Sequence, residues 1–332
     1  MLSELGEFDL IERFLSAFSN PSRDLVIPPG DDCAAFRVSP ETLMLVTTDL
    51  LIEHVHFDLS TIHPRQLGWK AMAVNISDIA AMGGTPAFGF LSIALPKRTS
   101  TAWIDALAEG MSACCTRYHV TLAGGDTTGS LHDIVINIGL IGFTSPQRCI
   151  RRNGALPGDC IQVSGPFGGS AAGLKLLALG TPLNPLEQSL ITAHLEPIPR
   201  VACGQALSQL TGVHAMIDVS DGLIQDLGHI CHASGVGAIV SAHSVPVYPG
   251  IPDRIGRERI DPLNLALSGG EDYELVWTVS PECADAALAS AVTAGALHAV
   301  TIGVIGEGQS VVVMLDGKPL QLARAGYDHF KP

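Results

Sequence analysis

The segment AVNISDIAAMGGTPA, at residues 73–87, constrains the fold most, because it sets one acid in a run of small and apolar residues. The residues around Asp78 predict a helix that ends at Gly83-Gly84. A helix that is apolar on nearly every side is stable only when other layers bury it. An ionised carboxylate there is costly unless a cation or several hydrogen-bond donors meet it. Taken alone, Asp78 is explained about as well by a turn cap, or by a position on the single solvent-exposed stripe of the helix, as by a bound cation.

The composition predicts a folded chain of two domains. Its 332 residues correspond to two domains of about 150 residues each. Hydrophobic residues make up 47% of the chain and charged residues 16%, which is ample for packed cores. The 19 basic and 33 acidic side chains give a net charge of −14, which disfavours binding to nucleic acid or to an anionic membrane. A phosphorylated substrate would therefore require divalent cations to cancel like charge.

The eight cysteines predict reduced, buried thiols, because no two form a C-x-x-C pair and most lie in apolar surroundings. The first 14 residues, MLSELGEFDLIERF, lack the basic and apolar regions of a signal peptide. No stretch is long and uncharged enough to cross a membrane. We expect a soluble, cytoplasmic protein.

Strand-like apolar runs alternate with helical spacings and predict a mixed α/β fold in both halves. In the first half the patterns predict helices at 6–18, 64–82 and 101–118, and strands at 43–51, 87–95, 119–124 and 133–143. In the second half they predict strands at 159–165, 215–220, 273–279, 300–306 and 311–315, and helices at 168–180, 221–234 and 282–296, with two further helical stretches before about residue 211. Basic, Pro and Gly residues cluster at 144–158, which places a domain boundary there, between domains 1–147 and 148–332.

Solitary aspartates recur where predicted strands end or helices begin. They stand in PPGDDCAA (28–35), VTTDLL (46–51), LAGGDTTGS (122–130) and MIDVSDGL (216–223), which we interpret as turns. Taken alone, each motif is explained at least as well by a structural turn or helix cap as by a ligand site. Together with Asp78 they supply seven carboxylates, which repel one another unless metal ions bridge them: Asp31, Asp32, Asp49, Asp78, Asp126, Asp218 and Asp221. Carboxylate oxygens are ligands that suit Mg²⁺, so the set favours a magnesium site.

The sequence lacks a P-loop, a kinase-type Gly-rich loop followed by V-A-I-K, and a dinucleotide fingerprint after the first strand. In phosphoryl transfer without a P-loop lysine, Mg²⁺ would carry most of the charge neutralisation. The Gly-rich run GPFGGSAAGLKLL (165–177) fits either a nucleotide loop or a helix start packed closely on a strand.

The motifs in order resemble the thiamine-monophosphate kinases, ATP-dependent enzymes of the AIR-synthetase-like (PurM-like) superfamily. The resemblance runs over nearly the whole chain, through GEFDLIERF, GDDCA, TTD, KAMAVNISDIAAMGG, GGDTT, NGALPGD, IDVSDGLIQDLGHI, SGGEDYEL and GYDHF. It implies two PurM-like α/β domains, of which the N-terminal one forms a dimer sheet or barrel. It also implies that a homodimer phosphorylates thiamine monophosphate to thiamine diphosphate with ATP and several Mg²⁺ ions, by direct in-line transfer.

The resemblance also implies residue roles. Asp78 would bridge several ions, and the metal ligands would be Asp32, Thr47, Thr48, Asp49, Asp78, Asp126, Asp218 and Asp221. ATP would contact Gly125, Asp126, Arg152 and Ser220. Thiamine monophosphate would contact His56, Glu271 and Tyr327. His54 is the alternative to His56, and Arg151 is the alternative to Arg152. No acid or base is expected, because a phosphate acceptor is already ionised near neutrality.

Other members of the superfamily fit less well. A selenophosphate synthetase would need a reactive Cys in a flexible N-terminal segment, whereas the first cysteine here is Cys33, inside the GDD motif. A hydrogenase-maturation dehydratase would need a C-terminal Cys, which this sequence does not have. An enzyme similar to the purine cyclo-ligases, or a scaffold that binds ATP and metal without catalysis, stays as the alternative.

Overall fold

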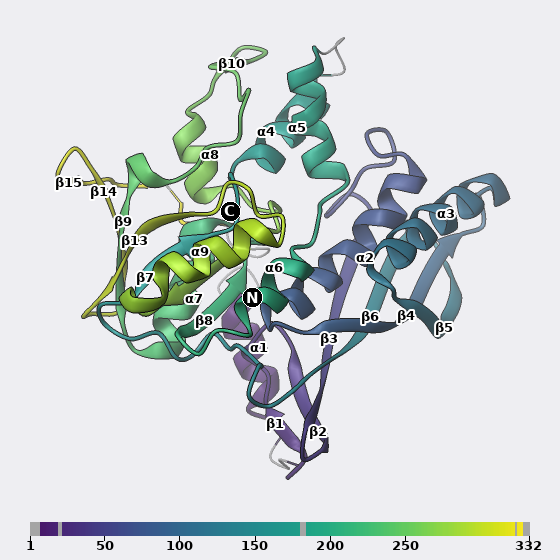
Figure 1. The fold of residues 1–332 in the computed structure, drawn as a ribbon. Coiled ribbons are helices and arrows are strands. Elements are labelled where there is room, and N and C mark those ends of the chain that lie inside the picture. Colours follow the sequence, from purple (N-terminus) through teal and green to yellow (C-terminus); the bar gives the residue numbers. More distant parts are fainter. Residues whose placement is uncertain (1–6, 19–21, 180–183, 323, 328–332) are drawn as a thin grey trace.

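The computed structural model describes residues 7–18, 22–179, 184–322 and 324–327. They form two α/β halves, each built on one sheet (Figure 1). A short helix, α1 (Glu7–Leu15), precedes the first sheet. Among the described helices, none has both the length and the apolar character that a membrane span requires. All eight cysteines are free, but only four of them are buried as expected: Cys33, Cys114, Cys203 and Cys231. The other four are half-buried.

The first half is a six-stranded mixed sheet. In spatial order its strands are β1 (Leu25–Ile27), β2 (Ala34–Ser39), β3 (Thr42–Ile52), β6 (Val135–Thr144), β4 (Thr85–Pro96) and β5 (Thr121–Ser130). The central strands β3 and β6 pair antiparallel along their whole length, from Leu43 opposite Thr144 to Ile52 opposite Val135. Alternate residues of β3 point to the core, which explains its apolar run. The edge strand β5 pairs only with β4, in parallel.

Two long helices cover the inner face of this sheet. The helix α2 (Pro64–Ala81) begins at a capping box formed by His63 and Gln66, and α3 (Thr101–Tyr118) packs on it. The two helices cross closely because glycine stands on both: a Cβ on Gly68 would lie 2.1 Å from the carbonyl oxygen of Leu107. A Cβ on Gly110 would lie 1.8 Å from the carbonyl oxygen of Arg65. The opposite face of the sheet has no helix over it in the described chain.

The second half is a seven-stranded sheet between two helical layers. In spatial order its strands are β15 (Lys318–Pro319), β14 (Val311–Leu315), β9 (Gly237–Ser241), β13 (Val300–Gly306), β7 (Cys160–Val163), β12 (Leu275–Val279) and β8 (Val213–Asp218). The remaining elements are α4 (Gly169–Leu177), α5 (Pro185–Leu195), α6 (Val201–Leu207), α7 (Leu223–Ser234), η2 (Ala242–Ser244), the ribbon β10 (Arg254–Ile255) and β11 (Glu258–Arg259), α8 (Pro262–Ser268), η3 (Pro281–Cys283) and α9 (Ala284–Thr293). Leu275 and Trp277 of β12 pack towards α6 and α9, and Val276 packs towards α7.

The helix α2 also joins the two halves. Its Trp69 donates a hydrogen bond from Nε1 to the carbonyl oxygen of Pro197, at 2.8 Å. Near its other end, a Cβ on Gly204 of α6 would lie 2.0 Å from the carbonyl oxygen of Ala80. The helix is therefore buried on nearly all sides, as its sequence predicts. This burial places Asp78 at the junction of the two halves.

Two sequence predictions are wrong at their boundaries. The predicted strand at 119–124 and the predicted turn at 122–130 are one strand, β5, so that Gly125 and Asp126 lie within a sheet. The predicted turn VTTDLL (46–51) likewise lies within a strand, because β3 runs on to Ile52. In both cases pairing with neighbouring strands overrides the local preference of Gly and Asp for turns. The elements without a counterpart among the predicted helices and strands are β1, β2, β9, η2, β10, β11, α8 and β15.

The close crossing of α2 and α3 yields a test of packing. We expect Gly110→Ala to lower the free energy of unfolding by about 1–3 kcal/mol, because the added methyl group forces the two helices apart. Urea denaturation measures this change. The control is Gly228→Ala in α7, where a Cβ meets nothing within 4 Å. That variant should gain up to about 1 kcal/mol from helix propensity, and equal effects in the two variants would contradict the assigned close contact.

Candidate active site

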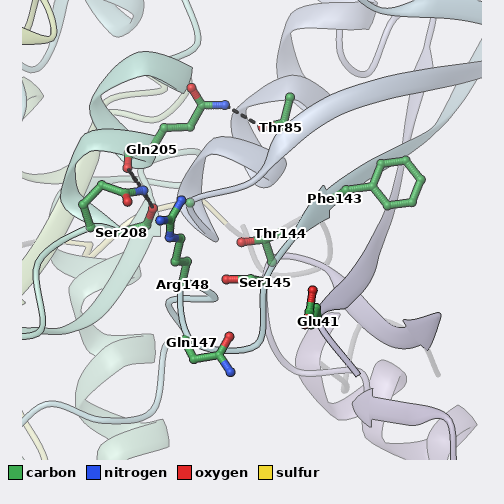
Figure 2. Close-up of a pocket in the computed structure, with 11 residues that line it drawn as sticks. Glu41, Thr85, Phe143, Thr144, Ser145, Gln147, Arg148, Gln205 and Ser208 are labelled. Carbon is green, nitrogen blue, oxygen red and sulfur yellow. Dashed lines mark hydrogen bonds between the residues drawn. The ribbon is translucent and has the colours of Figure 1, made fainter. Parts of the chain in front are cut away.

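A hollow of about 790 Å³ lies beside the C-terminal end of α2 (Figure 2). Neutral polar side chains such as Gln205 and Ser208 dominate its lining, with one acid, Glu41, and one cation, Arg148. Among the described residues, no group of three potential metal ligands includes a residue of this hollow. The predicted acidic residues lie elsewhere.

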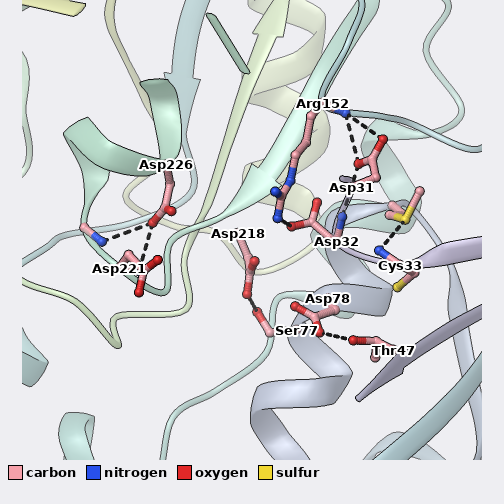
Figure 3. Close-up of polar contacts among 12 residues, drawn as sticks. Asp31, Asp32, Cys33, Thr47, Ser77, Asp78, Arg152, Asp218, Asp221 and Asp226 are labelled. Carbon is pink, nitrogen blue, oxygen red and sulfur yellow. Dashed lines mark hydrogen bonds and ion pairs between the residues drawn. The ribbon is translucent and has the colours of Figure 1, made fainter. Parts of the chain in front are cut away.

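Three of the predicted carboxylates meet where the two halves join (Figure 3). Asp32 comes from the turn before β2, Asp78 from α2, and Asp218 from the end of β8. One oxygen of each lies within 4.8 Å of the others. We call these three residues the carboxylate cluster. It draws on both halves of the chain, so the packing of α2 between them determines its geometry.

Two hydroxyl groups orient the cluster. Thr47 on β3 donates from Oγ1 to Oδ2 of Asp78, at 2.5 Å. Ser77, the neighbour of Asp78 on α2, donates from Oγ to Oδ2 of Asp218, also at 2.5 Å. Each bond holds one carboxylate oxygen and leaves the other one available to a ligand.

One arginine faces the cluster. Arg152 donates from Nη2 to Oδ1 of Asp32 at 2.6 Å, and its backbone N–H donates to Asp31. The Nε of Arg151 lies 3.6 Å from Oδ2 of Asp31. Of the two alternatives from the sequence, Arg152 is thus the one whose guanidinium contacts the carboxylate cluster.

Burial makes the cluster electrostatically unfavourable without a cation. It raises the pKa of Asp32 and of Asp218 to about 6. Burial, together with the charges of Asp49 and Asp218, raises the pKa of Asp78 well above its ordinary value. In addition, Oδ2 of Asp32 is buried and has no hydrogen-bond partner in the described part of the protein. Unpaired carboxylate oxygens with costly negative charge are what a hard divalent cation would satisfy, so these residues fit Mg²⁺.

The other predicted metal ligands on the first sheet differ in their position relative to the carboxylate cluster. Asp49 is near enough for its charge to act on Asp78, and its backbone N–H donates to Asn75 at 3.1 Å. Thr48 lies on the outer face of the sheet, where Asn137 donates to its Oγ1 at 2.8 Å. Asp126 is exposed on β5, which β6 and β4 separate from β3, and it accepts a bond from the backbone N–H of Thr127. The single chain therefore does not bring Asp126 into the carboxylate cluster.

The turn after β8 carries the next pair of predicted residues. Asp221 accepts a hydrogen bond from Nε2 of Gln225 at 3.2 Å, and it lies in one group with Asp226 and His229. Sequence reasoning missed Asp226, which follows Asp221 by five residues in the motif SDGLIQD. Its Oδ2 accepts from the backbone N–H groups of Asp221 and Gly222, so it fixes the turn that leads into α7.

The predicted substrate residues Glu271 and Tyr327 dock on this same turn. The backbone N–H of Glu271 donates to the carbonyl oxygen of Ser220 at 2.7 Å. The backbone N–H of Tyr327 donates to the carbonyl oxygen of Asp221 at 3.1 Å. Residues from the end of the described chain thus lie beside residues predicted to hold nucleotide and metal.

The two histidine alternatives differ in environment. His56 is half-buried, and its Nδ1 accepts a bond from the backbone N–H of Ile52 at 3.0 Å. This bond assigns the proton of the neutral ring to Nε2. His54 is exposed, with a φ of 67° and its Nδ1 3.6 Å from Oδ2 of Asp58. Only His56 has a ring held by the protein backbone.

The Gly-rich run at 165–177 is a helix start packed closely on its surroundings. Asp272 accepts bonds from the backbone N–H groups of Gly168, at 2.7 Å, and Ser170, at 3.0 Å. A Cβ on Gly169 would lie 2.5 Å from the ring of Tyr248. The donors that a phosphate would need are therefore already bound to a protein carboxylate, which favours the structural alternative over a nucleotide loop.

Charge repulsion in the carboxylate cluster predicts how stability depends on pH in EDTA. A carboxyl whose pKa rises from 3.8 to about 6 on folding contributes stability below about pH 4, and this contribution is lost as the pH rises through 6. We therefore expect Asp78→Asn to raise the melting temperature at pH 7.5 in EDTA by a few degrees, since about 1 kcal/mol corresponds to roughly 2–4 °C. The gain should shrink at pH 5.

Added Mg²⁺ should raise the melting temperature of the wild-type protein more than that of Asp78→Asn. The matched control is Asp105→Asn, at an exposed position of α3. Scanning calorimetry at both pH values measures these shifts. A lower melting temperature of Asp78→Asn in EDTA at pH 7.5 would contradict the assigned repulsion, because removing the charge would then cost more stability than it restores.

Comparison with known proteins identifies the family. Residues 30–144 match the model of the AIR synthase related protein, N-terminal domain, and residues 157–316 match its C-terminal domain. The chain is 39% identical to the thiamine-monophosphate kinase of Salmonella typhimurium over 335 residues, which cover 98% of each chain. It is 38% identical to that of Escherichia coli K12, with the same coverage.

A solved structure agrees with these relatives. AaThiL complexed with AMPPCP and TMP superimposes with a TM-score of 0.86 at 33% identity, over 99% of this chain and 98% of that one. This confirms the two PurM-like α/β domains and the resemblance found in the motifs. The chain belongs to the thiamine-monophosphate kinase family of the AIR synthase related (PurM-like) proteins.

Proposed function

We propose that the carboxylate cluster is the phosphoryl-transfer site of a thiamine-phosphate kinase, which converts thiamine monophosphate to thiamine diphosphate with ATP. The support for this activity is the full-length similarity of the chain to the kinases. The support for this location is the buried, unpaired Oδ2 of Asp32. It lies in a cluster of carboxylates, and burial makes their negative charge costly. ATP and thiamine monophosphate are both polyanions, so their reaction requires cancellation of charge and alignment above all.

The residues present fit a set of magnesium ions. Asp32, Asp78 and Asp218 would hold the central ions, with Asp78 shared between them, and Thr47 and Asp49 would complete their surroundings. Thr48, Asp126 and Asp221 would hold further ions. When bound, Mg²⁺ neutralises the phosphate oxygens and the charge that develops in transfer.

The protein's own side chains orient the two substrates. Arg152 keeps its charge beside Asp32, and its Nε is buried without a hydrogen-bond partner in the described chain, so it has a donor left for an ATP phosphate. Ser220 and the backbone at Gly125 and Asp126 would contact the nucleotide. No side chain acts as a base, because the acceptor phosphate of thiamine monophosphate is already ionised.

Thiamine monophosphate would bind between His56, Glu271 and Tyr327. The Nε2–H of His56 is a donor that suits its phosphate. The docking of Glu271 and Tyr327 on the Ser220–Asp221 turn would place the ring system of the substrate next to the nucleotide site. The exposed ring of Tyr327 could stack on that ring system and add about 0.5–2 kcal/mol through a cation–π contact.

A second copy of the chain would cover the outer face of the first sheet. Large apolar side chains gather on this face, with exposed fractions of 46% for Leu50, 42% for Phe88 and 40% for Phe90. The strand β5 is in addition an edge with unpaired backbone groups. A homodimer through the first halves would bury both and would enclose Asp126, which is exposed in the single chain.

The activity is tested by the acceptor. We expect ADP release in a coupled assay with thiamine monophosphate but not with thiamine, and none with either acceptor in excess EDTA. Asp78→Asn should lower kcat by orders of magnitude with Mg²⁺ saturating, because it removes the central charge of the cluster. Asp105→Asn is the control and should keep full activity. Equal rates with thiamine would contradict the assigned acceptor.

The two substrate sites are tested separately. Glu271→Gln and Tyr327→Ala should raise the KM for thiamine monophosphate and leave the KM for ATP nearly unchanged, because both residues would touch only the acceptor. Asp126→Asn should instead raise the KM for ATP. Steady-state titration of each substrate at saturating concentration of the other measures both constants. If Glu271→Gln weakens ATP and spares thiamine monophosphate, the two sites are reversed.

The homodimer is tested by sedimentation. We expect the wild-type protein to sediment as a dimer, and Leu50→Asp to shift it to a monomer, because a charge would be buried in the interface. Leu174→Asp is the control, since Leu174 of α4 is similarly exposed, at 53%, away from the first sheet. A wild-type monomer over a wide concentration range would overturn the dimer.

A further inference from the structure

A second ionisable group lies inside the apolar helix α2. Lys70 is 1% exposed, and its Nζ lies 2.9 Å from Oε1 of Glu271, in the loop between α8 and β12. A buried ammonium group is unfavourable unless a carboxylate pairs with it. Lys70 comes from the first half of the chain and Glu271 from the second, so this ion pair spans the junction.

The other oxygen of Glu271 also has a partner. Nδ1 of His194, a buried residue of α5, lies 3.2 Å from Oε2 of Glu271 and 3.0 Å from Oγ of Ser170. Burial and the charge of Lys70 lower the pKa of His194, so its ring is neutral. Burial alone would raise the pKa of Glu271, but Lys70 and His194 hold it well below its usual range. The carboxylate therefore stays ionised, with one partner on each oxygen.

The backbone of Glu271 is held as firmly as its side chain. Its φ is 65°, which is uncommon for a residue with a Cβ, and Tyr273 has a φ of 51°. The N–H of Glu271 donates to Ser220, and a Cβ on Gly270 would lie 2.6 Å from the carbonyl oxygen of Ser220. Unfavourable backbone conformations persist where the surroundings over-determine them, and they gather at ligand sites.

We propose that Lys70 and His194 are positioning residues for the acceptor substrate: they fix the Glu271 carboxylate in the one orientation in which it receives thiamine monophosphate. This inference rests on the proposed contact between Glu271 and that substrate. The carboxylate is 29% exposed, so it can still accept a further bond from a ligand. Because Lys70 balances the charge of Glu271, the Glu271 carboxylate contacts the substrate as an oriented hydrogen-bond acceptor rather than as an unpaired negative charge.

The same helix links this contact to the carboxylate cluster. Lys70 and Asp78 are eight residues apart on α2, or about 12 Å along the helix axis. One rigid element thus carries both the central acid of the phosphoryl-transfer site and the anchor of the acceptor site. This sets the distance between the substrate ring and the reacting phosphate, to which transfer rates are sensitive.

The test compares two variants of His194. His194→Leu removes the donor to Glu271, whereas His194→Asn keeps an amide nitrogen close to the position of Nδ1. We expect His194→Leu to raise the KM for thiamine monophosphate about tenfold, as expected for the loss of a hydrogen bond to a charged group. His194→Asn should stay within about twofold of wild type, since it restores that bond. The KM for ATP should be unchanged in both.

Lys70→Met should raise the same KM, with Lys175→Met as its control. Lys175 forms an ion pair of equal length, 2.9 Å, with Glu258, but on the surface. Thermal unfolding of every variant shows whether it is folded. If Lys70→Met unfolds, the double variant Lys70→Met/Glu271→Gln removes both charges and provides a folded reference without the buried pair.

Each outcome has a distinct meaning. Equal effects of His194→Leu and His194→Asn on the KM for thiamine monophosphate would overturn the positioning role. So would a fall in kcat and melting temperature without any change in that KM. If Glu271→Gln itself leaves the KM for thiamine monophosphate unchanged, then the substrate role of Glu271 is wrong and the inference falls with it, although the kinase activity stands.

Discussion

Three buried carboxylates that repel one another are held together at the junction of the two halves. Asp32, Asp78 and Asp218 come from three separate segments and converge within 4.8 Å, although burial makes their charges costly. Nothing in the formation of a hydrophobic core requires such a convergence. The fold holds it through the packing of α2 between the two sheets, so the stability of the core sustains a site that is itself destabilising without cations.

The helix α2 meets this demand because small residues let other elements approach it closely. Gly68 and Gly110 bring α3 against it, and Gly204 brings α6 against it near Ala80. Side chains at these positions would push the layers apart by ångströms. The geometry of the carboxylate cluster thus depends on contacts that contain no charged group at all.

Two ionisable groups lie on this buried helix, and their charges are balanced in different ways. Lys70 has a full partner in Glu271, so its charge is balanced within the chain. Asp78 has the hydroxyl of Thr47 and three acids around it, so its charge is balanced only when cations are bound. The first arrangement is typical of a structural ion pair, and the second is typical of a ligand-binding site.

Much of this could be predicted from the sequence, because it depends on short-range patterns. The apolar run around Asp78 predicts a buried helix, and the alternation of runs predicts two α/β halves. The ordered motifs predict the family. Local patterns determine these features because helix caps, turns and side-chain periodicity act over a few residues.

Which residues meet at the site depends on how the layers pack. The tertiary structure made GGDTT part of the edge strand β5 and left Asp126 away from the carboxylate cluster, because strand pairing outweighs turn preference. It selected Arg152 over Arg151 as the partner of Asp32, and it paired Lys70 and His194 with Glu271. These contacts join residues from about 77 to 201 positions apart, since 271 − 194 = 77 and 271 − 70 = 201. Charge complementarity at such separations has no local signal, and it exists only once the layers have packed around α2.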